Sequence, residues 1–258
     1  MHLRTAGERT ETKPLLMMHA SPASSRSLEP LIQQLAISRY VIAPDTMGCG
    51  DSAAPADESP DLAYYAGSMS RLLDTIDVDR VDVYGSHTGS HIGIELALAE
   101  PERVQSLTMD GVALLSKEDQ QDFLENYAPH KQADEFGGQL NWAWHYVRDQ
   151  MVFFPHYRKD EEHKRVGGSF DTNYLHELSL DVLKNIEHYH KTYEAVFRHH
   201  VLERIKDVKQ PTLLLTDTED VLGGAVPALK AANPKIDVRV VEEGYDQTAE
   251  FINAVSGY

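Results

Sequence analysis

The residues whose types and spacing could do chemistry meet in one segment, YGSHTGS at residues 84–90. An apolar run precedes it and a helical pattern, residues 91–100, follows it. Glycines two residues before and two residues after the central His87 permit the sharp strand-to-helix turn called a nucleophile elbow. Such a turn lifts its central side chain above the edge of the sheet, at the positive end of the next helix. The spacing therefore predicts that His87 faces a cavity.

The hydrophobic pattern predicts the strands and helices that hold this turn. Short apolar runs alternate along the chain with helical patterns. The runs are apolar throughout, which indicates strands that are covered on both faces. This pattern predicts an α/β fold with a mostly parallel, doubly wound sheet. The expected strands are residues 15–19, 40–44, 81–85, 104–110, 211–216 and 237–243.

Between residues 113 and 205 the pattern changes to helices alone. These 93 residues hold 14 of the 21 aromatic side chains and 9 of the 13 histidines. We expect a helical cap, or lid, over a cavity, with residues 1–112 and 206–258 as the core. Alternatively, the aromatic side chains only attach the segment to the sheet and Arg148 is solvated. If they line the cavity, Arg148 is available for a carboxylate. The candidate substrate-binding residues are Trp142, Trp144, His145, Arg148 and Phe154.

The composition of the 258 residues limits the classes of partner. A net charge of −17 argues against nucleic acid and anionic membranes, because both repel an acidic surface. The single Cys49 excludes a disulfide framework and a multi-cysteine zinc site. Apolar runs are too short to span a bilayer, and the first residues lack the apolar stretch of a secretory signal. We expect a cytoplasmic monomer or homodimer that acts on a small molecule. No motif requires a cofactor.

Five segments in order resemble the α/β-hydrolase superfamily, in particular its cap-bearing epoxide hydrolases, haloalkane dehalogenases and C–C hydrolases. The resemblance implies an α/β-hydrolase fold with an inserted helical cap. It also implies an oxyanion hole formed by the backbone N–H groups of Ser21 and Thr88, and a triad carboxylate at Asp220. The five segments are LLMMHASP (15–22), APDTMGCGDS (43–52), the turn at His87, PERVQSL (101–107) and PTLLLTDTED (211–220).

Two positions of the family's catalytic triad differ in this chain. His87 stands where the family has Ser, Cys or Asp, and no histidine follows His200. We therefore predict a non-standard triad in which His87 is a general base and a carboxylate fixes its tautomer. Asp220 is the first candidate for that carboxylate, and Asp246 and Asp110 are alternatives. The expected reaction is hydrolysis of a small carbonyl compound, namely an ester, lactone, amide or C–C bond, and a lyase reaction that abstracts a proton beside the carbonyl is the alternative.

Two other interpretations of His87 stay open at this point. The triad could have decayed, which would leave a catalytically inactive relative that binds a small molecule. Alternatively, His87 and His91 lie four residues apart on one helix face, a usable spacing for metal ligands. A hydrogen-bonded core histidine is the commoner outcome for a residue in the position of His91, so no metal is expected.

Overall fold

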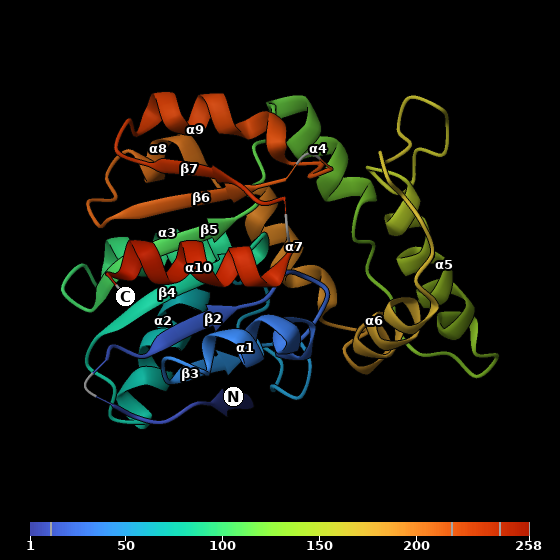
Figure 1. Ribbon diagram of the computed structural model, residues 1–258. Coiled ribbons are helices and arrows are strands. Elements are labelled where there is room, and N and C mark those ends of the chain that lie inside the picture. The colour runs from blue at the N-terminus through green and yellow to red at the C-terminus, as the bar shows by residue number, and fades with distance from the viewer. Residues whose placement is uncertain (11, 218, 243, 258) are drawn as a thin grey trace.

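The chain forms an α/β fold, seen in a computed structural model that describes residues 1–10, 12–217, 219–242 and 244–257 (Figure 1). Within these residues seven strands form one sheet, in the order β1-β3-β2-β4-β5-β6-β7. Strand β1 is antiparallel to β3 and the other neighbouring strands are parallel, which confirms the mostly parallel sheet. The strands are β1 (Leu3–Ala6), β2 (Leu15–Met18), β3 (Val41–Pro44), β4 (Val81–Ser86), β5 (Val104–Asp110), β6 (Thr212–Thr216) and β7 (Asp237–Val240).

Helices cover both faces of this sheet, which confirms the doubly wound arrangement. In β2, Leu15 and Met17 pack into one layer with α1 and α10, whereas Leu16 and Met18 pack into the other with α2 and α3. Buried apolar side chains cover both faces of the central strands, and this is why these strands have no polar alternation. The helices of the two layers are α1 (Glu29–Leu35), α10 (Tyr245–Ser256), α2 (Leu62–Thr75) and α3 (Thr88–Ala99), with α8 (Val201–Ile205) and α9 (Val226–Ala232) beside them and short 3₁₀ helices at Ser25–Leu28 and Gly223–Ala225.

The helical segment, residues 113–205, leaves the sheet after β5 and returns before β6. Figure 1 shows α5 and α6 packed together beyond the carboxyl ends of the strands, at the right of the view. Helix α7 contacts α3 and α4, and so connects the segment to the sheet layer. The division of the chain into core and cap stays a prediction. The helices of the segment that lie ahead of α8 are α4 (Lys117–Asn126), α5 (Gly138–Val152), α6 (Thr172–Lys184) and α7 (Tyr189–Phe197).

Two elements differ from the sequence-based expectation. Strand β1 was not anticipated, because it lies at an edge of the sheet and its side chains are partly exposed. Strand β7 ends at Val240, and residue 243, the expected end of that strand, lies outside the described residues. Helix α10 begins at Tyr245.

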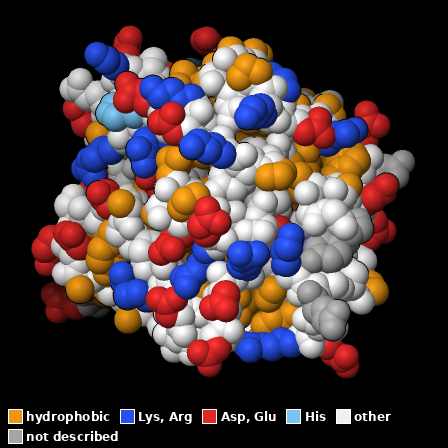
Figure 2. All heavy atoms as spheres, turned by 90° about the vertical axis from the view of Figure 1, so that its left-hand side faces the viewer, with side chains coloured by type: hydrophobic (Ala, Val, Ile, Leu, Met, Phe, Trp, Pro, Cys, Tyr) orange, Lys and Arg blue, Asp and Glu red, His pale blue; other side chains and the backbone are white. Residues whose placement is uncertain are grey.

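The face at the amino ends of the strands carries both signs of charge. Figure 2 shows acidic and basic side chains interspersed on this face, so the net charge of −17 is not gathered there. Among the described residues, none of the helices has the length and the apolar character that crossing a membrane requires.

Candidate active site

The turn at His87 has the geometry that its glycines predict. Strand β4 ends at Ser86, α3 begins at Thr88, and His87 between them has a φ of +48°. This left-handed backbone conformation is uncommon for residues other than glycine. A Cβ at Gly85 would lie 2.3 Å from the carbonyl carbon of Gly89, and a Cβ at Gly89 would lie 2.2 Å from the carbonyl oxygen of Met18. Neither glycine can therefore be replaced without moving the turn.

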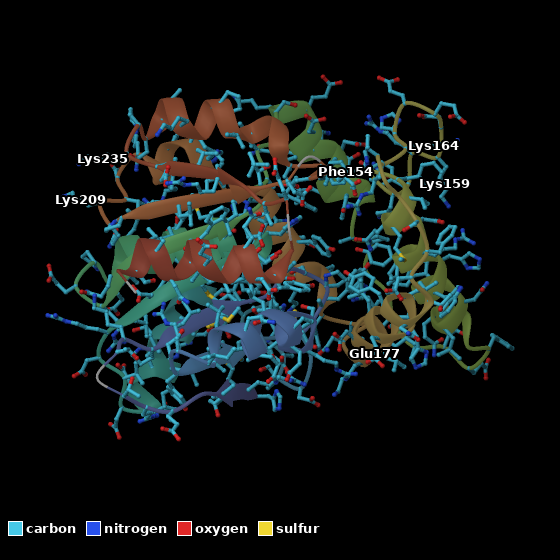
Figure 3. All side chains as sticks on the ribbon, in the orientation of Figure 1. Phe154, Lys159, Lys164, Glu177, Lys209 and Lys235 are labelled. Atoms are coloured by element: carbon cyan, nitrogen blue, oxygen red, sulfur yellow. The ribbon has the colours of Figure 1, made fainter. Side chains whose placement is uncertain are left out.

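A cavity of about 940 Å³ opens above this turn, at the carboxyl ends of the strands. Asp110 at the end of β5, His87 in the turn and Thr88 at the start of α3 line it on one side, and most of the opposite wall comes from the helical segment. Figure 3 shows Phe154 on that side, between the sheet and α5. The other aromatic residues that line the cavity from the helical segment are Phe123, Tyr127, Tyr174, Tyr193 and Phe197.

The imidazole of His87 is open to this cavity. The backbone N–H of His87 donates to the carbonyl oxygen of Asp110 at 2.8 Å, which fixes the turn against the end of β5. The ring lies against Gly111, where a Cβ would be 2.8 Å from Nε2. Among the described residues, no hydrogen bond or ion pair holds either ring nitrogen. Both nitrogens are thus available to water or a ligand.

Asp110 is the acidic neighbour of His87. The hydroxyl of Tyr84 donates to its Oδ2 at 2.5 Å. Burial raises the pKa of Asp110, while the hydrogen bond from Tyr84 and the charge of His87 lower it, and Asp220 and Asp217 raise it further. Burial and the charge of Asp110 hold the pKa of Tyr84 well above its ordinary value, so its hydroxyl stays protonated. A buried carboxyl group that accepts a hydrogen bond from Tyr84 therefore lies near the imidazole of His87.

Among the described residues, none of the three candidate carboxylates is hydrogen-bonded to the ring of His87, and Asp220 and Asp246 have other surroundings. Asp220 lines the cavity, but its Oδ1 accepts the backbone N–H of Leu222 at 2.8 Å and so stabilises its own loop. Among the described residues no ion pair joins it to His87. Asp246 lies in the first turn of α10, where it is exposed and does not line the cavity. The register of the sheet explains why Asp110 is the neighbour of His87, because β4 and β5 pair Ser86 with Asp110.

The two backbone groups expected to form an oxyanion hole lie next to each other. The N–H of Ser21 donates to Oγ1 of Thr88 at 3.2 Å, so this donor already has an acceptor inside the protein. Thr88 is the first residue of α3, and its own N–H has no acceptor within the helix. Helix α7 holds Ser21 in place, because Ser21 Oγ donates to Thr192 Oγ1 at 2.7 Å and Tyr193 donates to the Ser21 carbonyl oxygen at 2.8 Å.

His91 does not form a metal site with His87, because partners occupy both of its nitrogens. Its Nε2 accepts the N–H of Ala113 at 3.1 Å, and its Nδ1 lies 2.8 Å from Nδ1 of His199. Since an amide N–H can only donate, the proton of His91 is on Nδ1 and is donated to His199. Nε2 of His199 then donates to Glu95 at 2.9 Å. Burial holds the pKa of His91 well below its ordinary value.

One other group of side chains has the composition of a metal site. Among the described residues, His2, Asp45 and Asp51 could bring one ligand atom each within 4.8 Å of the others. Asp45 also accepts the backbone N–H groups of Ser25 and Asp51, which fixes the loop after β3. This group does not line the cavity at His87.

Four of the five candidate substrate-binding residues lie on α5, on faces that do not line the cavity, and the fifth, Phe154, follows the end of that helix. Of the five, Phe154 alone lines the cavity, among the residues that the structure describes. The ring of Trp142 stacks on Tyr146, and the side chain of Trp144 is exposed. The reason is the helical period, because the face of α5 toward the cavity carries other residues. They are Val147, Gln150 and Met151.

The polar candidates of α5 are also engaged elsewhere. Nδ1 of His145 donates to the carbonyl oxygen of Asn141 at 2.8 Å, and Arg148 pairs with Asp149 at 2.6 Å. Sequence reasoning did not single out Gln150 or Arg165, which do line the cavity. In the sequence, each of these two residues stands among other polar residues, so nothing distinguishes it from a residue exposed to solvent.

Comparisons with known proteins agree with this architecture. The family model described as "alpha/beta hydrolase fold" matches residues 13–245. The chain belongs to the α/β-hydrolase family. An α/β-hydrolase structure, the enol-lactonase from Burkholderia xenovorans LB400, superposes with a TM-score of 0.72 at 18% identity, over 99% of this chain and 93% of that chain. At this identity the similarity shows the fold alone.

Two curated relatives of this α/β hydrolase match different lengths of it. The 2-hydroxymuconate semialdehyde hydrolase of Pseudomonas sp. (strain CF600) is 36% identical over 109 residues, which are 40% of this chain and 38% of that protein. The proline iminopeptidase of Lactobacillus delbrueckii subsp. bulgaricus is 27% identical over 241 residues, which are 85% of this chain and 78% of that protein. The chain thus spans less than half of the first relative and most of the second.

Proposed function

We propose that this α/β hydrolase cleaves a small carbonyl compound, an ester, lactone, amide or C–C bond, with His87 as a general base. The observation that carries the proposal is the open imidazole of His87, raised into the cavity by a strained turn beside Asp110. Both curated relatives carry the names of hydrolytic enzymes, which supports hydrolysis as the reaction.

The proposed reaction begins with a water molecule between the ring of His87 and the substrate carbonyl. The ring nitrogen takes a proton from the water while the water oxygen attacks the carbonyl carbon. Asp110 stabilises the resulting imidazolium, and the N–H of Thr88 at the positive end of α3 stabilises the oxyanion. The imidazolium then returns its proton to the leaving group as the tetrahedral intermediate collapses. This sequence forms no acyl-serine intermediate.

The helical segment takes the role of a cap in this proposal. Its aromatic side chains form the wall opposite His87, which limits the water that reaches the site. A site with little water strengthens the interaction of a single N–H donor with a developing oxyanion. This matters here because the N–H of Ser21 already donates to Thr88.

The experiment compares His87→Ala with Ser86→Ala, since both residues line the cavity. Turnover is measured on a panel of esters, lactones, amides and dicarbonyl compounds at several pH values. We expect His87→Ala to lose all measurable turnover and Ser86→Ala to keep most of it. A serine-directed fluorophosphonate probe should leave the wild type unlabelled.

Three results would contradict the proposal. Full activity of His87→Ala would place the site elsewhere, and labelling of Ser86 would mean that a serine is the nucleophile. Ligand-induced thermal shifts without any product would identify a protein that only binds its ligand.

A further inference from the structure

A single cationic side chain, Arg165, reaches the cavity. Among the described residues that line it, Arg165 is the only lysine or arginine. The lysines of the same loop, Lys159 and Lys164, lie on the outer side of the helical segment (Figure 3) and pair with Asp149 and Glu161. Arg165 has no such partner, because no ion pair within the described parts of the chain includes it.

The hydrogen bonds of Arg165 are incomplete. Its Nη1 donates to the carbonyl oxygen of Gln150 at 2.9 Å. Its Nε is buried and has no hydrogen-bond acceptor among the described residues. An unpaired buried donor on a charged group is unfavourable, so an anion that enters the cavity would satisfy it. The guanidinium presents N–H groups in a planar fork that matches a carboxylate.

The two walls of the cavity differ in charge. The wall formed by the ends of the strands and the loops after them is acidic, and Arg165 comes from the opposite helical segment. Arg165 shares Gln150 with Tyr193, whose hydroxyl lies 3.3 Å from Gln150 Oε1 and 2.8 Å from the Ser21 carbonyl oxygen. A chain of hydrogen bonds therefore connects the wall that carries Arg165 to Ser21, in the loop after β2. The acidic residues of the lining are Asp110, Asp217, Glu219, Asp220 and Glu242.

We propose that Arg165 binds a carboxylate of the substrate, so the substrate is a carbonyl compound that also carries a carboxylate group. This inference rests on the proposed function, because it assigns the substrate of that same site. One guanidinium facing an acidic wall suits a monoanion better than a doubly charged phosphate. The role assigned from sequence to Arg148 thus passes to Arg165, because Arg148 is already paired with Asp149.

Glu219 is the competing anion. Its carboxylate lies against Gly167, which is two residues after Arg165 in the sequence. A Cβ on Gly167 would be 2.3–2.4 Å from the carboxylate oxygens. A carboxylate at this place opposes the entry of a second one. Removing the charge of Glu219 should therefore strengthen the binding of a carboxylate, whereas removing the charge of Arg165 should weaken it.

The experiment measures the binding of monomethyl glutarate and of its neutral analogue, dimethyl glutarate, by calorimetry. It is run in the His87→Ala background, where the proposed chemistry is absent and the ligands persist. We expect the monoester to bind about ten times more tightly than the diester. Arg165→Gln should remove this difference, Arg165→Lys should keep part of it, and Glu219→Gln should increase it. The melting temperature of each variant checks that it is folded.

Equal binding of the two esters to the His87→Ala protein would overturn the inference, and so would a folded Arg165→Gln variant that keeps the tenfold difference. Neither result depends on turnover. The proposed function fails separately, if His87→Ala hydrolyses the panel as fast as the wild type does. The same binding series with monomethyl succinate and monomethyl adipate would give the distance at which the carboxylate is held.

Discussion

His87 and His91 lie four residues apart at the start of one helix, yet their surroundings are opposite. The ring of His91 is fully buried and both of its nitrogens are hydrogen-bonded. The ring of His87 faces the cavity, and neither nitrogen has a hydrogen-bond partner among the described residues. Residue type and helical spacing therefore do not decide the role of a histidine. Its role depends on whether its ring nitrogens already have hydrogen-bond partners within the protein.

The bound histidine also stabilises the surroundings of the free one. His91 accepts the N–H of Ala113, and so fixes the loop in which Gly111 supports the ring of His87. Behind His91, Glu95 accepts hydrogen bonds from His199 and from both Nε and Nη2 of Arg204. Burial alone would raise the pKa of Glu95, but these partners lower it to about 2.

Replacing His91 should give the largest change in stability. His91→Leu leaves the N–H of Ala113 and Nδ1 of His199 buried without partners, so we expect the free energy of unfolding to fall by about 3 kcal/mol. Urea denaturation measures it. His176→Leu, on the exposed side of α6, is the matched control and should change stability by less than about 0.5 kcal/mol. Similar small losses in both variants would show that the partners of His91 contribute little.

The pH dependence of stability sharpens the same contrast. Because burial lowers the pKa of His91, the unfolded chain binds a proton more readily than the folded one. The contribution of His91 to stability is complete above about pH 6.5 and is lost as the pH falls below that value. Between pH 6.5 and 5.5 we expect the stability of the wild type to fall more steeply than that of His91→Gln, by up to about 1.4 kcal/mol per pH unit. Parallel curves would contradict this.

Comparing wild type and variant is necessary because other histidines titrate in the same range. Burial also lowers the pKa values of His19, His156 and His190. These residues contribute equally to both proteins and cancel in the difference. The low pKa of Glu95 acts in a separate window, where stability is lost as the pH falls from about 4.5 toward 2.

The smallest expected change in stability concerns the backbone of His87. His87→Gly removes the Cβ from a residue with a φ of +48°, so we expect stability to rise by about 1 kcal/mol while turnover is lost. His87→Ala is the control, because it keeps the Cβ and should not show this gain. Denaturation curves of both variants give the answer. An equal rise in both would mean that the imidazole, and not the backbone, is the source of the strain.

Much of the fold followed from the sequence, because its signals are local. The apolar runs from Leu15 and from Val104 correspond to strands buried within the sheet, and the glycines around His87 specify a turn in a few residues. Edge strand β1 could not be predicted in this way, because its side chains are partly exposed and do not form an apolar run.

The details of the site could not be predicted in the same way, because they depend on long-range contacts. Asp110 lies beside His87 because two parallel strands pair in one register, which residues far apart in the sequence determine. On α5, aromatic residues occur on several faces, so composition could not show which face meets the cavity. The packing of α5 against α6 decides it, and it selects Val147, Gln150 and Met151.

The attachment of α7 has a consequence for the passage of molecules into and out of the cavity. Thr192 and Tyr193 hydrogen-bond to Ser21, so α7 is tied to the loop after β2. A movement that widens the entrance must either break both bonds or leave α7 where it is. A displacement of the paired helices α5 and α6, with the segments on either side of them as hinges, would break neither of these hydrogen bonds. Under the proposed function, the product could then leave while the loop that contains Ser21 stays in place.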